Sequence, residues 1–169
     1  YVSDQKAVSE TACPAGSYQP SAGQSSCIQA SPGYYVAFEG STEQIPAPLD
    51  EYASSLPGSI NTEKCPQGSI TLQNASTSID DCYLDSDGDR SPDHLDDDDD
   101  DDGVPDSIDR FPLDPSESTD SDGDGMGDNS DPDDDNDGFS DVKELDCDSD
   151  PLTFDSTPID ADGDGICDS

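Results

Sequence analysis

The sequence predicts a fold with little regular secondary structure, in which small disulfide-held modules of loops and short β-strands precede an array of acidic loops. Three observations predict it. Only 28% of the 169 residues are hydrophobic, which leaves little apolar surface for a conventional core. There are six cysteines, and 43 acidic residues against 5 basic ones give a net charge of -38. Disulfides and bound cations must therefore supply much of the order.

The acidic residues divide the chain into two domains. Of the 43 acidic residues, 36 lie in residues 80–169, beside only three basic residues. We place a cysteine-rich domain at 1–82 and an acidic domain at 83–169. The charge excludes nucleic acid as a direct partner, because phosphates would be repelled. The sequence contains no apolar run long enough to span a membrane. It starts without Met and stops within a repeat, so we expect a processed protein or a segment of a longer one.

The cysteine-rich domain is rich in Ser, Gly, Pro and Thr, and its strand-like stretches at 16–19, 34–38 and 69–72 are short. A small module of loops is therefore expected. Its aromatic residues form either a recognition surface or, as the favoured interpretation, its minimal core; they are Tyr18, Tyr34, Tyr35 and Phe38. Asn74 begins an Asn-Ala-Ser tripeptide, which predicts glycosylation on a loop.

The six cysteines favour disulfides and an oxidising compartment. Many pairings are possible, and we expect sequence neighbours to pair, because each pair then closes a short loop: Cys13–Cys27, Cys65–Cys82 and Cys147–Cys167. A zinc site is the alternative. It is disfavoured because the sequence has no C-x-x-C pair and His94 is its only histidine.

The acidic domain repeats one pattern, with Asp at +0, +2, +4 and +8, Gly at +5 and an acid at +11. The acidic residues of the five loops are Asp85, Asp87, Asp89, Asp93 and Asp96 in loop one, Asp98, Asp100, Asp102, Asp106 and Asp109 in loop two, Asp120, Asp122, Asp124, Asp128 and Asp131 in loop three, Asp133, Asp135, Asp137, Asp141 and Glu144 in loop four, and Asp160, Asp162, Asp164 and Asp168 in loop five. A further copy begins with Asp146, Asp148 and Asp150 but breaks at Pro151. Arg90 replaces the glycine of loop one. Successive loops start 13, 22, 13 and 27 residues apart, as two close pairs and a distant fifth.

This spacing fits the coordination of a hard cation. Calcium takes about 6–8 oxygen ligands at about 2.3–2.6 Å. Alternate residues of a tight loop can point inward, so +0, +2 and +4 supply three carboxylates, and Gly at +5 permits the sharp turn. The +6 carbonyl and the acids at +8 and +11 would close the shell. Magnesium keeps its waters, and transition metals prefer His or thiolate ligands, so at least five calcium ions are expected.

The loops copy the first positions of an EF-hand, but one loop can start two residues after the last one ends. Seven prolines exclude helices of useful length from this domain. A solvated, disordered tail is the alternative interpretation. Five copies of the same spacing of acidic residues and glycine argue against a disordered tail. Without ions, however, the close carboxylates would repel and extend the chain.

The runs DSDGDGMGD at 120–128 and DDDNDG at 133–138 resemble thrombospondin type 3 repeats, and the 13- and 22-residue spacings are similar to that family's short and long units. The segment FPLDP at 111–115 resembles the linker of microbial members. The resemblance covers about 84–169 and implies a chain wrapped around a string of calcium ions, with disulfides joining neighbouring units. Cys147–Cys167 fits that role. Arg90 departs from the family's glycine.

The run from Cys13 to Cys27, followed by PGYYV at 32–36, resembles an ephrin-receptor-like cysteine-rich repeat, and CPQG at 65–68 begins a similar copy. Between them, IPAP at 45–48 stands where a cysteine is expected, so the middle copy has lost its bridge. The resemblance covers about 12–82 and implies an extracellular spacer or recognition module.

The sequence predicts no enzyme. Carboxylates are everywhere, no apolar cleft is available to raise the pKa of one of them, and His94 has no catalytic partner. We expect an extracellular calcium-binding structural protein, such as a calcium-rigidified stalk or filament subunit on a microbial surface. One alternative is an adhesion module whose cysteine-rich half binds a partner and whose acidic half is a spacer; another is a calcium buffer. Besides calcium, expected partners are a second copy of the chain, another surface protein or a glycan.

Overall fold

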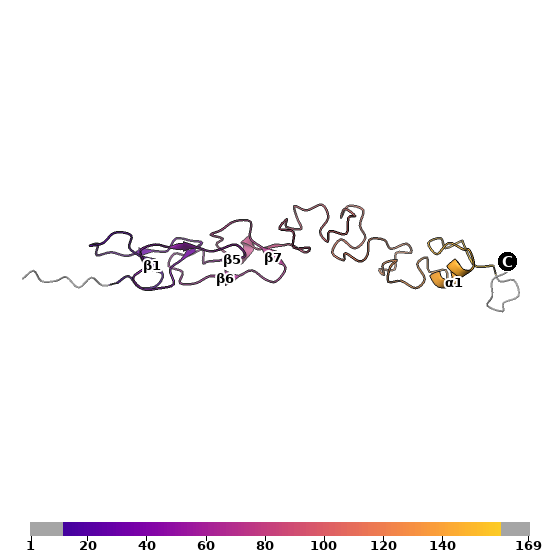
Figure 1. The fold of residues 1–169 in the computed structure, drawn as a ribbon, viewed down its shortest axis with the longest axis horizontal. Helices are drawn as coiled ribbons and strands as arrows, with labels where there is room; N and C mark the ends of the chain where they lie inside the picture. Colours follow the sequence, from indigo (N-terminus) through magenta and orange to yellow (C-terminus); the bar gives the residue numbers. More distant parts are fainter. Residues whose placement is uncertain (1–11, 160–169) are drawn as a thin grey trace, which may run out of the picture. The chain divides into compact units, whose positions relative to one another are not determined.

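The computed structural model describes residues 12–159, which form two compact units (Figure 1). The N-terminal unit extends to His94 and the C-terminal unit begins at Leu95. The predicted irregular fold is confirmed, since the described elements are strands of two residues, a 3-10 turn and a six-residue helix. Cys167 and the acidic residues of loop five lie outside the described residues.

The N-terminal unit consists of four antiparallel hairpins. They pair β1 (Ser17–Tyr18) with β2 (Ile28–Gln29), β3 (Tyr34–Tyr35) with β4 (Ile45–Pro46), β5 (Glu51–Tyr52) with β6 (Glu63–Lys64), and β7 (Ser69–Ile70) with β8 (Tyr83–Leu84). The 3-10 turn η1 (Ile79–Asp81) precedes β8. The three predicted strand-like stretches contain β1, β3 and β7. The other five strands were missed, because two residues of strand leave no period to detect.

These hairpins form a repeat, since their first strands begin 17 or 18 residues apart. The residue before each first strand has a positive φ of 65–83°; these residues are Gly16, Gly33, Asp50 and Gly68. The carbonyl of each accepts a hydrogen bond of 2.9–3.0 Å from a backbone N–H later in the chain, and the donors are Ala30, Ala47, Cys65 and Asp85 respectively. These bonds extend each hairpin by one rung. Other backbone bonds join each hairpin to the next as a ladder: the N–H of Gly16 donates to the carbonyl of Val36 over 2.8 Å, that of Val36 to Ser59 over 3.0 Å, and that of Ala53 to Ser76 over 3.0 Å. Loop one follows directly, because Asp85, which closes the fourth hairpin, is its first residue.

The core of this unit is a line of small side chains; the buried hydrophobic residues are Cys13, Ala30, Val36, Ala47, Ala53 and Ile70. The prediction of an aromatic core is wrong. Tyr18, Tyr34 and Tyr35 are only half-buried, and Phe38 is 77% exposed. The reason is the close approach of the second hairpin to the fourth. A Cβ built on Gly33 would lie 2.0 Å from the carbonyl oxygen of Ala75, so large side chains do not fit between the backbones.

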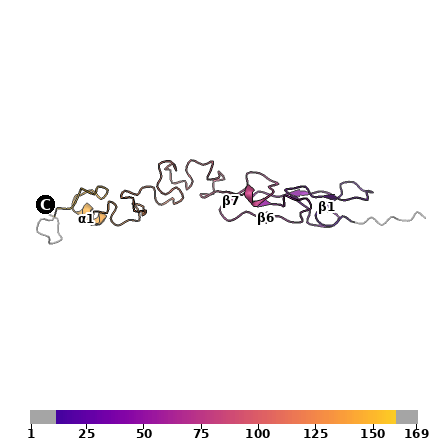
Figure 2. The ribbon, with the colours of Figure 1, turned by 180° about the vertical axis from the view of Figure 1, so that it is seen from behind.

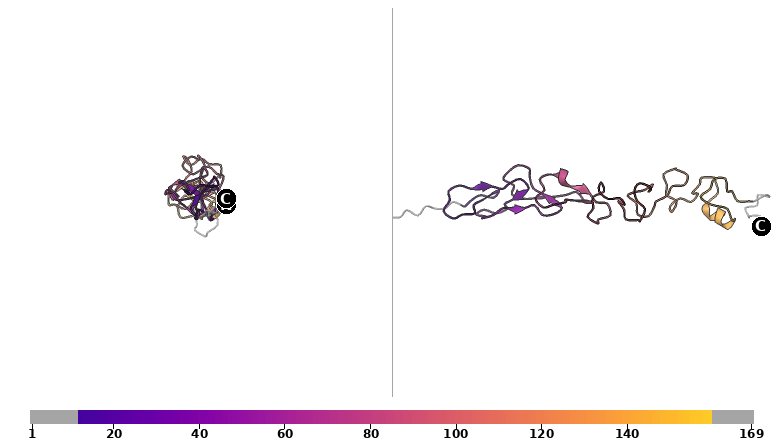
Figure 3. Two further views of the ribbon diagram at one scale, coloured as in Figure 1. Left: turned by 90° about the vertical axis from the view of Figure 1, so that its left-hand side faces the viewer. Right: turned by 90° about the horizontal axis from the view of Figure 1, so that it is seen from above.

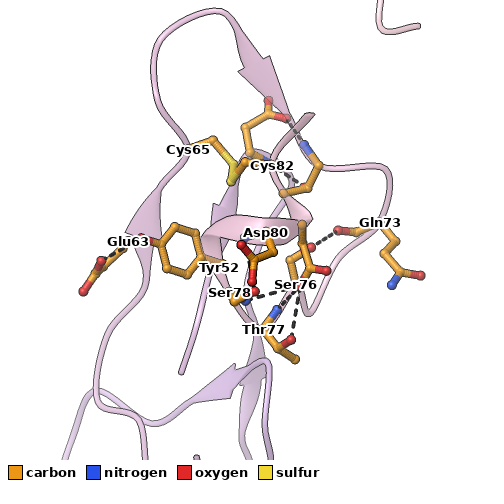
Figure 4. The surroundings of a disulfide bond; sticks show 12 residues. Tyr52, Glu63, Cys65, Gln73, Ser76, Thr77, Ser78, Asp80 and Cys82 are labelled. Carbon is orange, nitrogen blue, oxygen red and sulfur yellow. Dashed lines mark hydrogen bonds between the residues drawn. A yellow bond between two sulfur atoms is a disulfide. The ribbon is translucent and has the colours of Figure 1, made fainter. Parts of the chain in front are cut away.

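Two of the three predicted disulfides, Cys13–Cys27 and Cys65–Cys82, are confirmed, with Cα–Cα distances of 5.6 and 5.7 Å. They close the first and last hairpins, and Figure 4 shows the second. The predicted partner of Cys147 is outside the described residues. In the unbridged second hairpin, the Gln44 side chain accepts a hydrogen bond of 2.7 Å from the backbone N–H of Ser31. The lost bridge of the middle copy is thus replaced by weaker contacts.

The C-terminal unit contains loops two to four and the helix α1 (Asp141–Asp146), and the ribbon of loops two and three is free of regular elements from either side (Figures 2 and 3). The side chain of Ser140 caps α1 by accepting a hydrogen bond from the N–H of Lys143. The helix lies in the long proline-free stretch between Pro132 and Pro151. At under two turns it stays within the predicted limit on helix length. No helix in the described part could cross a bilayer.

Replacing Gly33 by Ala should destabilise the N-terminal unit by at least about 2 kcal/mol, because it adds a steric clash to an unfavourable φ of +77°. Gly23 is the matched control. Its φ is +76° with nothing within 4 Å of an added Cβ, so Gly23→Ala should cost only about 1 kcal/mol. Denaturant unfolding of both variants in calcium measures the difference. Equal losses would show that the close approach to Ala75 contributes nothing.

Candidate metal sites

The four described loops share one set of hydrogen bonds. The backbone N–H at +8 donates to the carbonyl at −1 over 2.9–3.1 Å, and the carboxylate at +8 accepts from the N–H at +1 over 2.8–2.9 Å. The +8 residues are Asp93, Asp106, Asp128 and Asp141. Each +8 residue therefore closes its loop, and one oxygen of its carboxylate already accepts a backbone hydrogen bond.

Two positions of every described loop have a positive φ. At +3 they are Gly88, Asp101, Gly123 and Asn136, and at +5 they are Arg90, Gly103, Gly125 and Gly138. The glycines at +5 have φ values of 95–96°, as the predicted sharp turn requires. Arg90 has a φ of 80° at the same position, where an L side chain is strained. The loop backbone is therefore the same in loop one despite the substitution.

The turns bring three carboxylates together in each loop. The triads are Asp85, Asp87 and Asp89; Asp98, Asp100 and Asp102; Asp120, Asp122 and Asp124; and Asp133, Asp135 and Asp137, with ligand oxygens that lie within 4.8 Å of one another. In every triad the carboxylates at +2 and +4 each accept one backbone hydrogen bond from the residue two positions later. The backbone therefore holds these side chains in place.

The interrupted copy behaves differently. Asp146, Asp148 and Asp150 form no such group among the described residues. Instead, the carboxylate of Asp150 accepts hydrogen bonds of 3.2 Å from the N–H of Leu152 and the hydroxyl of Thr153, which makes a turn at Pro151.

Loops two and four bury carboxylate oxygens that have no hydrogen-bond partner. In loop two they include oxygens of Asp98, Asp100 and the +11 acid Asp109; in loop four they belong to Asp133, Asp134, Asp135, Asp137 and the +11 acid Glu144. Glu144 is fully buried, with both oxygens unpartnered. Such groups are costly unless a positive charge compensates them. Among the triads, loop three has one such oxygen, on Asp122, and loop one has none.

Electrostatics places the +11 acids beside their triads. Burial raises the pKa of Glu144, and the carboxylates of Asp135, Asp137 and Asp133 raise it further. Burial likewise raises the pKa of Asp100, against a backbone hydrogen bond from Asp102, and Asp109 is among the carboxylates that add to the shift. In each of these loops the +11 acid thus interacts through its charge with carboxylates of the triad, which suits a hard divalent cation.

Sequence reasoning missed Asp134, which lies at +1 of loop four. Burial, followed by the charges of Asp141, Asp128, Asp131 and Asp135, raises its pKa from 3.8 to about 6. A signal did exist, because +1 is Asp in loops two and four. In loops one and three it is a serine whose hydroxyl donates to the +8 carboxylate over 2.9 Å. Asp134 therefore adds charge where loops three and four meet.

Glu117 was also missed, because it lies between loops. It is 5% exposed and accepts hydrogen bonds from the N–H of Asn129, at 3.0 Å, and from the hydroxyl of Ser130. Glu117 thus ties the segment after the FPLDP linker to loop three.

Loop one is attached to the hairpins. The Arg90 guanidinium forms an ion pair with Asp50 at 3.3 Å, and the rings of Tyr83 and His94 lie 5.0 Å apart. Asp50 itself donates its N–H to the hydroxyl of Thr71 over 2.9 Å. Arg90 therefore places a positive charge on loop one and directs it towards the hairpins.

Asn74 is exposed, next to the buried Ser76, whose hydroxyl donates to the carbonyl of Gln73 over 3.1 Å (Figure 4). Glycosylation of Asn74 stays a prediction.

Comparison with known families gives a match at the N-terminal end. Residues 1–46 match the family described as tyrosine-protein kinase ephrin type A/B receptor-like. The match includes the Cys13–Cys27 disulfide and the first two hairpins, and thus confirms part of the expected ephrin-receptor-like region. It does not reach the acidic loops, which are consistent with thrombospondin type 3 repeats. No curated protein matches the chain.

Replacing Arg90 by Gly should tighten metal binding at loop one, because the change removes a positive charge and a strained φ. Terbium luminescence sensitised by Tyr83, two residues before the triad, reports this loop. The half-saturating terbium concentration should fall by up to about fivefold, the equivalent of about 1 kcal/mol. Arg90→Lys, which keeps the charge, should leave it unchanged. A similar shift in both variants would contradict the role of charge.

The pKa of Asp134 predicts a pH effect in the calcium-free chain. In the folded chain the carboxylate of Asp134 takes up a proton as the pH falls through about 6, whereas in the unfolded chain it does so only near 3.8. Because the folded state binds the proton at the higher pH, the free energy of unfolding rises as the pH falls from 7.5 to 5. At pH 7.5, Asp134→Asn should therefore compact the chelated chain, as measured by its radius of gyration. Asp114→Asn removes the same charge, but hydrogen bonds from Ser116 lower the pKa of Asp114, so this variant should not compact the chelated chain. Equal compaction by both variants would leave only net charge as the cause.

Proposed function

We propose that the protein is an extracellular calcium-binding structural protein whose acidic domain is ordered by calcium. The observation that carries this proposal is the set of buried, unpartnered carboxylate oxygens in loops two and four. Calcium would be held by the triad of each loop, together with the acids Asp109 and Glu144 at +11 of loops two and four. Bound calcium supplies the charge neutralisation that these carboxylates lack.

Charge and ligand chemistry support calcium over other ions. The described triads offer carboxylate oxygens and contain no His or thiolate ligand, which suits calcium better than transition metals. Binding to a site that exists only in the folded chain also stabilises the fold. We propose that the loops are thrombospondin type 3 repeats, with which their spacing is consistent.

The setting is extracellular, because disulfides and an ephrin-receptor-like module are typical of proteins that fold in an oxidising compartment. We favour a role as a stalk or filament subunit and propose no catalytic activity. The hairpins are joined to one another through backbone hydrogen bonds, as the stacked repeats of a solenoid contact their neighbours, and such a stack suits a spacer. Calcium would give the acidic domain rigidity.

Small-angle scattering of the whole chain tests the proposal. With millimolar calcium, we expect a defined particle; with excess chelator, we expect a larger radius of gyration, restored when calcium is added back. The cause is repulsion among the uncompensated carboxylates. A radius that ignores chelation would overturn calcium-dependent order, whereas assemblies that form only with calcium would favour the filament role over the stalk.

Glu144→Gln tests the site in loop four, because it removes the charge of a fully buried ligand while keeping its size. Calcium titration calorimetry should show one site weakened at least about tenfold, the equivalent of about 1.4 kcal/mol. Glu39→Gln is the matched control, because Glu39 is exposed in the N-terminal unit. Unchanged affinity in Glu144→Gln would exclude Glu144 as a ligand.

A further inference from the structure

The hairpin repeat places a tyrosine at the second position of three successive first strands. These residues are Tyr18 in β1, Tyr35 in β3 and Tyr52 in β5, each 17 residues from the next and each half-buried. Cross-strand partners lie on the same face of a hairpin. The partners of Tyr18 and Tyr35 are Ile28 and Ile45, but that of Tyr52 is Glu63. The third hairpin thus replaces an apolar pair with a polar one.

The polar pair is built into one arrangement. The hydroxyl of Tyr52 donates a hydrogen bond of 2.9 Å to the carboxylate of Glu63. This bond raises the pKa of Tyr52, so the hydroxyl stays protonated. In Figure 4 the ring of Tyr52 points its hydroxyl at Glu63, and the segment with Thr77 and Ser78 lies on the other side of the ring.

A cavity of about 360 Å³ opens at this pair, at the small end of the range for ligand pockets. Besides Tyr52 and Glu63, its lining includes Ser54, Ser59, Asn61 and Ser78. The side-chain oxygen of Ser59 accepts from the N–H of Ser54 at 3.1 Å, and that of Ser54 accepts from the N–H of Leu56 at 3.0 Å. Both hydroxyls therefore keep their protons for a ligand.

The lining selects a class of ligand. It offers one aromatic face, one carboxylate, one amide, several hydroxyls and the apolar side chain of Ile79, and no basic side chain lines it. An anion would meet Glu63 without a compensating charge, and an apolar ligand would leave the hydroxyls unpaired. A sugar ring suits all of these groups, because its hydroxyls both donate and accept and its C–H face packs on an aromatic ring.

We propose that this cavity is a carbohydrate subsite, in which a neutral pyranose stacks on Tyr52 while Glu63 accepts hydrogen bonds from its hydroxyls and Asn61 and the serines complete the contacts. This binding is independent of the calcium sites, because the hairpin has no acidic triad. The subsite would let the N-terminal unit attach to a glycan on a neighbouring surface.

Saturation-transfer NMR with the full chain tests the subsite. The probes are methyl β-D-glucopyranoside, methyl α-D-mannopyranoside and methyl β-D-galactopyranoside, each at millimolar concentration, with calcium and with chelator. Transfer to the ring protons of at least one probe is expected under both conditions. Tyr52→Ala should weaken binding at least about tenfold and Glu63→Gln severalfold. Tyr35→Ala, at the same position of the preceding repeat, should leave it unchanged.

Backbone chemical shifts of the unmodified chain provide a test that does not depend on a variant folding. Changes confined to residues around 52–63 and 77–79 would support the subsite. Absence of transfer to all three probes, shifts elsewhere, or equal losses in Tyr35→Ala and Tyr52→Ala would overturn it. Binding of a lysine-rich peptide in place of the pyranosides would also overturn it, in favour of a cationic partner. Failure here leaves calcium binding intact, since calorimetry measures that separately.

Discussion

Repulsion between carboxylates is the constraint on which the acidic half of this protein depends. Each loop brings three acids within a few ångströms of one another and fixes them with its own backbone N–H groups. The +8 aspartate closes the loop, and the turns at +3 and +5 set its curvature. Because the backbone is committed to holding like charges together, the free energy of the fold depends on what compensates that charge. This dependence is strongest in loops two and four, which bury the most carboxylate oxygens without a hydrogen-bond partner.

The hairpin half meets the same shortage of apolar residues in a different way. Its core is a row of small side chains, and its continuity comes from backbone hydrogen bonds between successive hairpins, with a disulfide at each end. The last rung of the fourth hairpin is donated by the N–H of Asp85, which is also a triad residue of loop one. One residue therefore belongs to both systems, and the Arg90–Asp50 ion pair reinforces the same junction.

Local chemistry could be predicted from the sequence, and long-range chemistry could not. The triads and the two described disulfides follow from spacing alone, because their partners lie within a few residues or one loop of each other. The sequence indicated one middle copy of the hairpin repeat where there are two, because Ala30 and Ala47 stand where the outer copies carry cysteines. The bonds that join the copies use backbone groups common to every residue. Glu117 lies between loops, where the repeat pattern carries no information, and Asp134 lies at a +1 position whose Asp recurs only in loops two and four.

The backbone ladder has a consequence for how this chain can change over generations. A bond between a carbonyl and an N–H survives almost any substitution except one by proline, and only the tight approach at positions such as Gly33 restricts the residue type. Most surface side chains are thus free to drift while the architecture persists. Copies can be duplicated or deleted without redesigning an interior, so proteins of this kind can diverge in length and sequence faster than in shape.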